Sequence, residues 1–335
     1  MKYRRRRSSR APSFVEGANA CLDDLPIEIQ AYCQKWTLRV LVDLGGHKSV
    51  LHDDYCSEPH LIFSLDLGYS AEDDYEHKAV LAALKKKHRE VIGRTLPPLP
   101  ESNLVRNINW LANELGLTEI ERNILLFCVI ERQHAFLRQT MASLGEMSTE
   151  RAVTTLSVLL DISPQEVYKA LSFESTLIRS GLICVDQNNI FDFCNKIGLI
   201  NGITERINAE PENPFDIFSV NFVVAPSPEL TLANFDYLGP KVSYLAKYLK
   251  QVIESSGKGV NVLLYGVPGG GKTQLARALA GEINANLFEV AVEDRDGGRI
   301  GGVNRMSAYR LSQRILSKRK GSCLLYTSPS PRDCS

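Results

Sequence analysis

The sequence predicts a mostly α-helical N-terminal region that ends in a helix, helix and hairpin pattern, followed by the start of an α/β domain. Three observations support this fold class. Apolar residues recur at helical spacing along much of 25–171, and two helices followed by two short strands are predicted within 148–193. An apolar run at 262–265 leads through a glycine-rich loop into a helix-forming segment. With 335 residues, 44% of them hydrophobic, the chain is long enough for two or three domains.

Charge and cysteine content narrow the classes of partner and compartment. Lys plus Arg and Asp plus Glu both count 39, so no overall charge favours nucleic acid or an anionic membrane. The eight cysteines form no C-x-x-C pair, which indicates reduced thiols and predicts a cytoplasmic protein. The apolar run at 124–130 is too short to span a membrane, and no apolar segment follows Arg4–Arg7. We therefore expect no membrane partner.

The first 95 residues predict a basic tail and a helical domain. Residues 1–22 are expected to be a disordered basic tail, although its arginines are also suited to contact nucleic acid. Residues 23–95 predict a helical domain, because 25–44 carries one apolar helical face and 70–92 carries a second.

Three histidines and one cysteine between these two predicted helices are of residue types that bind zinc: His47, His52, Cys56 and His60. Structural zinc sites usually show close pairs of ligands. The loose spacing here favours ordinary loop residues, and a zinc site is the alternative.

Proline-rich residues 96–100 cannot continue a helix and mark the first domain boundary. The next domain is predicted at 102–205. Within it, Thr118–Glu121 and Ser163–Glu166 each have the pattern of a capping box, the second with proline at the first helical position.

Two short strands are predicted at 182–185 and 190–193, joined by turn residues 186–189. Helix, turn, helix and hairpin together resemble a winged-helix domain, a fold that often binds DNA. Residues 164–193 carry four acidic and only two basic side chains: Glu166, Glu174, Asp186 and Asp192 against Lys169 and Arg179. Because phosphate contact needs the opposite balance, we favour a protein-binding or structural winged-helix-like domain over a DNA-binding one. Residues 206–230, rich in proline, are predicted to be a linker.

The glycine-rich loop matches the Walker A pattern G-x-x-x-x-G-K-T from Gly266 to Thr273. Its glycines let backbone N–H groups point inward at phosphate oxygens, and the next helix adds the positive end of its dipole. Lys272 is then expected to reach the β- and γ-phosphates, and the Thr273 hydroxyl to hold Mg²⁺. The alternative is a glycine-rich turn without a ligand.

The segment Asn234–Gly239, followed by a helix, an apolar strand and this loop, resembles the start of an AAA+ ATPase module, a P-loop NTPase fold, over 231–322. The resemblance implies ATP and Mg²⁺ as cofactors, a ring-forming homo-oligomer, and ATP hydrolysis with Lys272 as a catalytic residue. It also implies that the strands at 262–265 and 287–292 are not neighbours in the sheet. The nucleotide-binding residues expected on this basis are Tyr237, Gly239, Gly266, Pro268, Gly269, Gly270, Gly271, Lys272, Thr273 and Gln274, with Thr273 also the metal ligand.

Two positions depart from the family pattern. Gly270 stands where the family usually has threonine or another polar residue, which loosens the loop without removing a phosphate ligand. Arg299-Ile300-Gly301 stands where protein-threading members have an aromatic residue, an apolar residue and glycine. Arginine does not grip a polypeptide as an aromatic ring does, which argues against simple unfoldase activity.

The C-terminal end is expected to be foreign to the protein. Residues 323–335 look like a sequencing-adaptor translation, with Cys323–Thr327 apolar enough to imitate a strand. We therefore expect a fragment that lacks the Walker B, sensor and arginine-finger residues and does not hydrolyse ATP. For the intact protein, we expect a ring-forming remodeller of a protein partner. An AAA+ motor or loader on DNA and a nucleotide-dependent switch are the alternatives.

Overall fold

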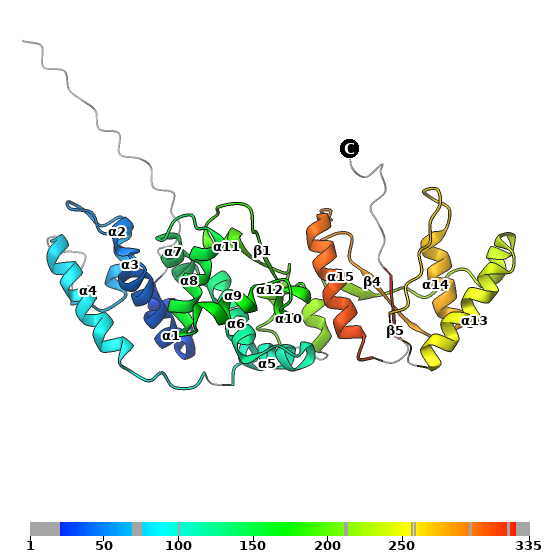
Figure 1. Cartoon of the computed structure of the whole chain (residues 1–335), viewed down its shortest axis with the longest axis horizontal. Helices are drawn as coiled ribbons and strands as arrows, with labels where there is room; N and C mark the ends of the chain where they lie inside the picture. Colours follow the sequence, from blue (N-terminus) through cyan, green and yellow to red (C-terminus); the bar gives the residue numbers. More distant parts are fainter. Residues whose placement is uncertain are drawn as a thin grey trace, which may run out of the picture.

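The structure is a computed structural model that describes residues 21–68, 76–99, 101–210, 214–255, 257, 259–294, 297–319 and 322–325. Most of the predicted basic tail and the end of the predicted foreign tail lie outside these residues. Figure 1 shows the helices of the N-terminal half at one end of the molecule and α13 and α14 at the other, with α15 and β4 between them.

The N-terminal helices follow the predicted apolar faces. The 25–44 helix is observed as α1, which continues into a π-helical turn, and the 70–92 helix as α4, which begins at His77 after the extended residue Glu76; 69–75 lies outside the described residues. One small core joins α4 to the π-helical turn through side chains such as Leu41 and Leu84. The elements are α1 (Ile27–Leu38), η2 (Arg39–Asp43), α2 (His47–Val50), α3 (Pro59–Phe63) and α4 (His77–Ile92), after η1 (Leu22–Asp24).

Two of the helices predicted within 102–205 begin at the predicted capping boxes. Thr118 and Ser163 accept hydrogen bonds from the backbone N–H groups of Glu121 and Glu166, and each glutamate returns a bond, so both capping boxes are confirmed. The helices are α5 (Asn103–Leu115), α6 (Glu119–Gln133), α7 (Ala135–Ala142), α8 (Thr149–Leu160), α9 (Pro164–Ala170) and α10 (Thr176–Arg179).

The predicted pairing of 182–185 with 190–193 was wrong. β1 (Ile183–Val185) instead pairs antiparallel with β2 (Ile197–Leu199). The reason is Asp192, whose carboxylate accepts a 2.8 Å hydrogen bond from the Asn195 N–H and so starts the short helix α11 (Phe193–Lys196). The position of the second strand therefore depends on a helix cap that the alternating pattern concealed.

The predicted linker at 206–230 is more structured than its proline content indicated. It contains η3 (Pro214–Phe218) and β3 (Phe222–Val224), just after α12 (Ile203–Arg206). β3 pairs antiparallel with β4 (Asn286–Val290), with Phe222 opposite Val290. The side chains of Ile217, Phe218 and Phe222 are buried in the main core, which overrides the proline signal.

β4 is the middle strand of a three-stranded sheet in the order β3-β4-β5. β5 (Ser322–Leu325) pairs parallel with β4, so part of the predicted foreign tail forms a strand, as its apolar composition permits. The predicted strand at 287–292 is thus observed within two residues, whereas the run at 262–265 joins no described sheet. No described strand lies beside this run, and Val262, Leu263 and Tyr265 are exposed, Tyr265 to 88%, whereas Leu264 packs against the core of α13 and α14.

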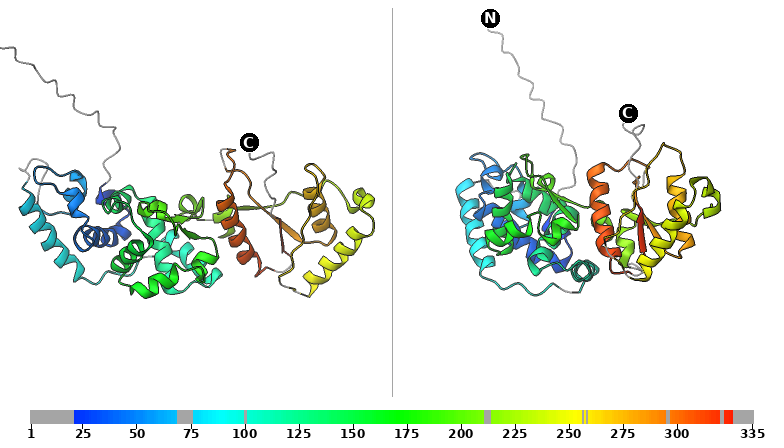
Figure 2. Two further views of the ribbon diagram at one scale, coloured as in Figure 1. Left: turned by 45° about the horizontal axis from the view of Figure 1, so that its top comes forward. Right: turned by 45° about the vertical axis from the view of Figure 1, so that its right-hand side comes forward.

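The sheet packs with the main core, and a separate core lies among the helices beyond it. The main core includes α1, the helices from α5 to α10, β3 and the buried face of α15 (Gly302–Leu316). A separate core joins η4 (Leu232–Leu238), α13 (Lys241–Glu254) and α14 (Lys272–Glu282). Both views in Figure 2 place α15 on the side of the sheet that faces the helices from α1 to α12, which we call the helical domain, and α13 and α14 on the other side.

Candidate nucleotide-binding site

The glycine-rich loop bends sharply into α14. Gly269 and Gly271 have φ of 78° and 77°, a conformation that residues with a Cβ rarely adopt. Gly271 is the N-cap of α14, and a Cβ built there would lie 3.6 Å from the Phe235 ring. Gly270 is outside the left-handed region, yet a Cβ there would lie only 3.1 Å from the Val267 carbonyl oxygen. Backbone conformation therefore favours glycine at 269 and 271, and the close approach to Val267 favours it at 270.

Lys272 is the first residue of α14 and its side chain folds back over the loop. Its Nζ donates hydrogen bonds to the carbonyl oxygens of Gly266, at 3.1 Å, and Val267, at 2.9 Å. The positive charge is thus held inside the loop, next to the N-terminal end of an eleven-residue helix. The N-terminus of a helix and a nearby positive charge both favour anions, so this end of α14 suits a phosphate group.

The next two residues lie in the first turn of α14, and both are partly buried. Thr273 places a hydroxyl directly after the lysine. The buried Oε1 of Gln274 has no hydrogen-bond partner among the described residues. A buried acceptor without a partner is unfavourable, so this amide is poised to bond a group brought by a ligand or solvent.

α14 holds the loop through a buried face. Leu275, Ala278 and Leu279 pack in the smaller core with Phe235 of η4 and Val242 of α13. The opposite side of the helix carries Arg277, whose guanidinium makes a two-pronged contact with the Glu289 carboxylate of β4. The hydrogen bonds that Arg277 donates to the Glu289 carboxylate stabilise the charged guanidinium and raise the pKa of Arg277.

The structure brings the predicted loop and helix residues together, whereas the residue predicted beside the adenine is largely exposed. The loop and the first turn of α14 are contiguous, and η4 packs against α14. Tyr237, predicted beside the adenine, is 72% exposed, and its ring contact is with Phe235 at 6.4 Å between centroids. Gly239 follows as the cap of η4, at φ 70°. Phe235, which was not predicted as a site residue, is the aromatic residue of this segment that lies against the loop. The sequence indicated it only as an apolar residue at the start of the motif.

The alternative zinc ligands make separate contacts. His47 Nδ1 lies 2.5 Å from the Leu41 carbonyl oxygen, and His60 Nε2 lies 2.9 Å from Gln139 Oε1. His52 stacks on Tyr55, and burial raises the pKa of the Cys56 thiol. Within the described residues, no group of three or more His, Cys, Asp or Glu side chains is placed to hold a metal ion.

Comparison with known families identifies the segment that contains this site. Residues 262–323 match the family described as ATPase family associated with various cellular activities (AAA). The match supports an ATPase of the AAA type. It spans the glycine-rich loop, α14, β4 and α15, and so includes Lys272 and Thr273. Comparisons with curated proteins and with solved structures found no match.

The described part of the chain contains no helix that is both long enough and apolar enough to cross a membrane. The AAA-type segment is mixed α/β, as its sequence pattern predicted, and the helices that precede it form the larger part of the structure.

Proposed function

We propose that this protein is an AAA-type ATPase that binds ATP with Mg²⁺, assembles as a ring of identical subunits and does conformational work on a protein partner. The observation that supports this most directly is the loop from Gly266 to Gly271. It has three glycines at positive φ, and it is followed by a helix N-terminus and by Lys272, which folds back on it, within a segment that matches the AAA family. These are the features that bind a chain of phosphates.

The residues at the loop fit an ATP–Mg²⁺ complex. The backbone N–H groups of Gly269, Gly270 and Gly271 would hold phosphate oxygens, and Lys272 would exchange its two carbonyl acceptors for phosphate oxygens. Thr273 would hold Mg²⁺ through its hydroxyl. Bound ATP would supply the phosphoanhydride bond whose hydrolysis drives the conformational work.

The partner proposed for the helical domain is a protein. Two large side chains on α9 and after it are mostly exposed, Tyr168 and Phe173. Exposed aromatic residues of this kind are typical of protein-binding surfaces. Residues 164–193 carry more acidic than basic side chains, which disfavours phosphate contact.

The metal ligand provides a test of the proposed function. We expect the protein to bind a fluorescent ATP analogue, and we expect Mg²⁺ to strengthen this binding through Thr273. Thr273→Ala removes one hydroxyl contact, so the Mg²⁺-dependent gain is expected to fall by about 0.5–1.5 kcal/mol, or roughly 2–12-fold in affinity. Titration with Mg²⁺ or with EDTA measures this gain, and Thr273→Ser, which retains the hydroxyl, serves as the control. Absence of binding by the wild type would contradict the function, and an undiminished gain in Thr273→Ala would contradict the metal assignment.

Duplex DNA distinguishes the preferred partner from the alternative. We expect the protein to show no binding of random duplex DNA at moderate salt, because residues 164–193 are net acidic. Fluorescence anisotropy of a labelled duplex at two salt concentrations measures this. Micromolar binding that weakens steeply with salt would favour a motor or loader that acts on DNA.

A further inference from the structure

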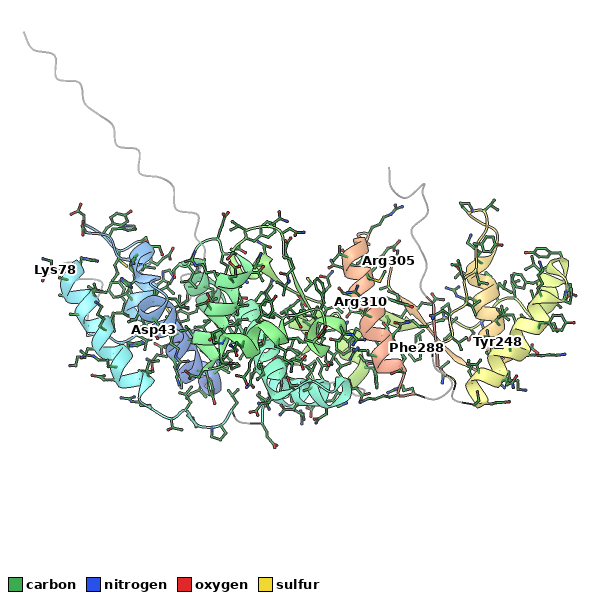
Figure 3. All side chains as sticks on the ribbon, viewed as in Figure 1. Asp43, Lys78, Tyr248, Phe288, Arg305 and Arg310 are labelled. Carbon is green, nitrogen blue, oxygen red and sulfur yellow. The ribbon has the colours of Figure 1, made fainter. Side chains whose placement is uncertain are left out.

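The two cores divide the AAA-type segment along β4. α14 begins at the glycine-rich loop Gly266–Gly271, called the phosphate loop below, and belongs to the smaller core with η4 and α13. α15 belongs to the main core, where Leu311 and Ile315 are fully buried together with Phe218 of η3. Figure 3 labels Phe288 on the sheet, between α15, which carries Arg310, and α13, which carries Tyr248. The phosphate loop and the helical domain are therefore parts of different packing units.

One ion pair joins α14 to the sheet between these units. Arg277 Nε lies 2.7 Å from Glu289 Oε1, and Arg277 Nη2 lies 3.0 Å from Glu289 Oε2. The two side chains are only 20% and 19% exposed, so water screens the pair less than it screens a surface pair. Two parallel hydrogen bonds also fix the orientation of the guanidinium, which a single contact does not. The negative charge of Glu229 also raises the pKa of Arg277.

The position of Glu289 in the sheet allows a displacement of α14 to reach the neighbouring strands. In the sheet it lies opposite Val223 of β3 and Leu325 of β5. The adjacent Phe288 packs edge-on against Phe222, a member of the main core, with 6.1 Å between ring centroids. A movement of β4 therefore meets side chains that are already packed against the helical domain.

α15 is held firmly to that domain. A Cβ built on Gly181 would lie 2.5 Å from the Ser307 carbonyl oxygen, so this glycine permits a close backbone approach. Arg319, just after α15, lies 3.5 Å over the Phe215 ring, and Lys318 Nζ is 3.7 Å from Glu114 Oε1. The sheet, α15 and the helical domain are thus joined by backbone, aromatic and charged contacts.

In the glycine-rich loop, Lys272 makes hydrogen bonds that a bound phosphate group must replace. Lys272 Nζ is bonded to two carbonyl oxygens of its own loop, and these bonds must break before the amine turns to an anion. Arg277 is five residues further along the same helix, about one and a half turns away. A shift of the first turn of α14 therefore moves the whole of this rigid helix, and with it the Arg277 side of the ion pair.

From these contacts we propose that Arg277 and Glu289 are a positioning pair that couples occupancy of the phosphate loop to α15 and the helical domain. The proposal rests on the proposed function, since it requires nucleotide at the loop. It assigns no role in the chemistry to either side chain. The pair fixes the position of α14 on the sheet, and bound nucleotide changes that position.

Hydrogen exchange on the whole chain tests the pair without nucleotide. We expect Arg277→Gln and Glu289→Gln each to speed exchange of the α14 amides. The reversed pair Arg277→Glu with Glu289→Arg is expected to restore part of the protection. The matched control is Arg106→Gln, which breaks the exposed pair with Glu210 and leaves α14 exchange unchanged. Wild-type exchange rates in both single variants would overturn the positioning role.

The coupling is tested with a non-hydrolysable ATP analogue and Mg²⁺. In the wild type we expect the analogue to change exchange in α15 and around Gly181. Each single variant is expected to bind the analogue within about fivefold of wild type, because the pair does not touch the loop, yet to lose the distant change. Binding by the wild type without a distant change, or a distant change that persists in both single variants, would overturn the coupling. Failure of the wild type to bind would instead contradict the proposed function.

Discussion

Lys272→Ala is expected to weaken binding of an ATP analogue by tenfold or more. The substitution removes a charged donor to phosphate, a contact worth about 1.5–3 kcal/mol, and each 1.4 kcal/mol corresponds to about a tenfold change in affinity. The net loss stays within this range because free Lys272 already bonds the carbonyl oxygens of Gly266 and Val267, and it gives up these bonds on binding. Titration of a fluorescent ATP analogue in the presence of Mg²⁺ measures the effect.

Lys250→Ala provides a matched control, because Lys250 is an exposed lysine of α13 and its removal changes net charge by the same amount. Its affinity for the analogue is expected to equal that of wild type. Thermal unfolding of both variants establishes that neither has lost its fold. Equal affinities for Lys272→Ala and wild type would show that the loop is a structural turn.

Local signals in the sequence predicted much of the helical part correctly. The capping boxes at Thr118 and Ser163 depend on residues three positions apart, so the sequence contains all the information that sets where these helices begin. The glycine-rich loop is equally local, and Gly269 and Gly271 have the positive φ that favours glycine at these positions.

Long-range packing was not accessible from the same patterns. β3 lies in a segment predicted to be a linker, and it forms a strand only because β4, more than sixty residues later, pairs with it. β2 was displaced from the predicted hairpin by the cap at Asp192. Both outcomes depend on tertiary pairing, which overrides the weak preference of short apolar runs.

The same limit applies to the candidate site. The motif identified the loop and Lys272, but the aromatic residue against the loop is Phe235, whereas Tyr237 faces solvent. The Arg277–Glu289 pair joins a helix to a strand and has no signature in either segment alone. Side chains that meet only in the folded state require the structure.

The shared core also changes how the N-terminal helices are understood. Residues 23–95 and 102–205 were predicted as separate domains on either side of a proline-rich boundary. The main core nevertheless includes Cys33 and Trp36 of α1 together with α6 and α8. Arg39 adds polar contacts across this boundary, since it donates to the carbonyl oxygens of Val158 and Leu159. We therefore expect α1 to unfold together with the helices of the second domain.

Phe127→Ala is expected to lower the free energy of unfolding of the helical part by about 3–5 kcal/mol, because it leaves a cavity in a fully buried region. The Phe127 ring packs edge-on against Trp36 at 5.0 Å and against Phe193 at 5.7 Å, so its loss affects α1, α6 and α11 together. Urea unfolding followed by tryptophan fluorescence and by circular dichroism measures the change, and both signals are expected to shift to the same lower midpoint. Tyr168→Ala, at a position that is 65% exposed, controls for loss of an aromatic ring and is expected to change stability by no more than about 0.5 kcal/mol. Separate midpoints for the two signals, or equal stabilities of the two variants, would contradict a single core that includes α1.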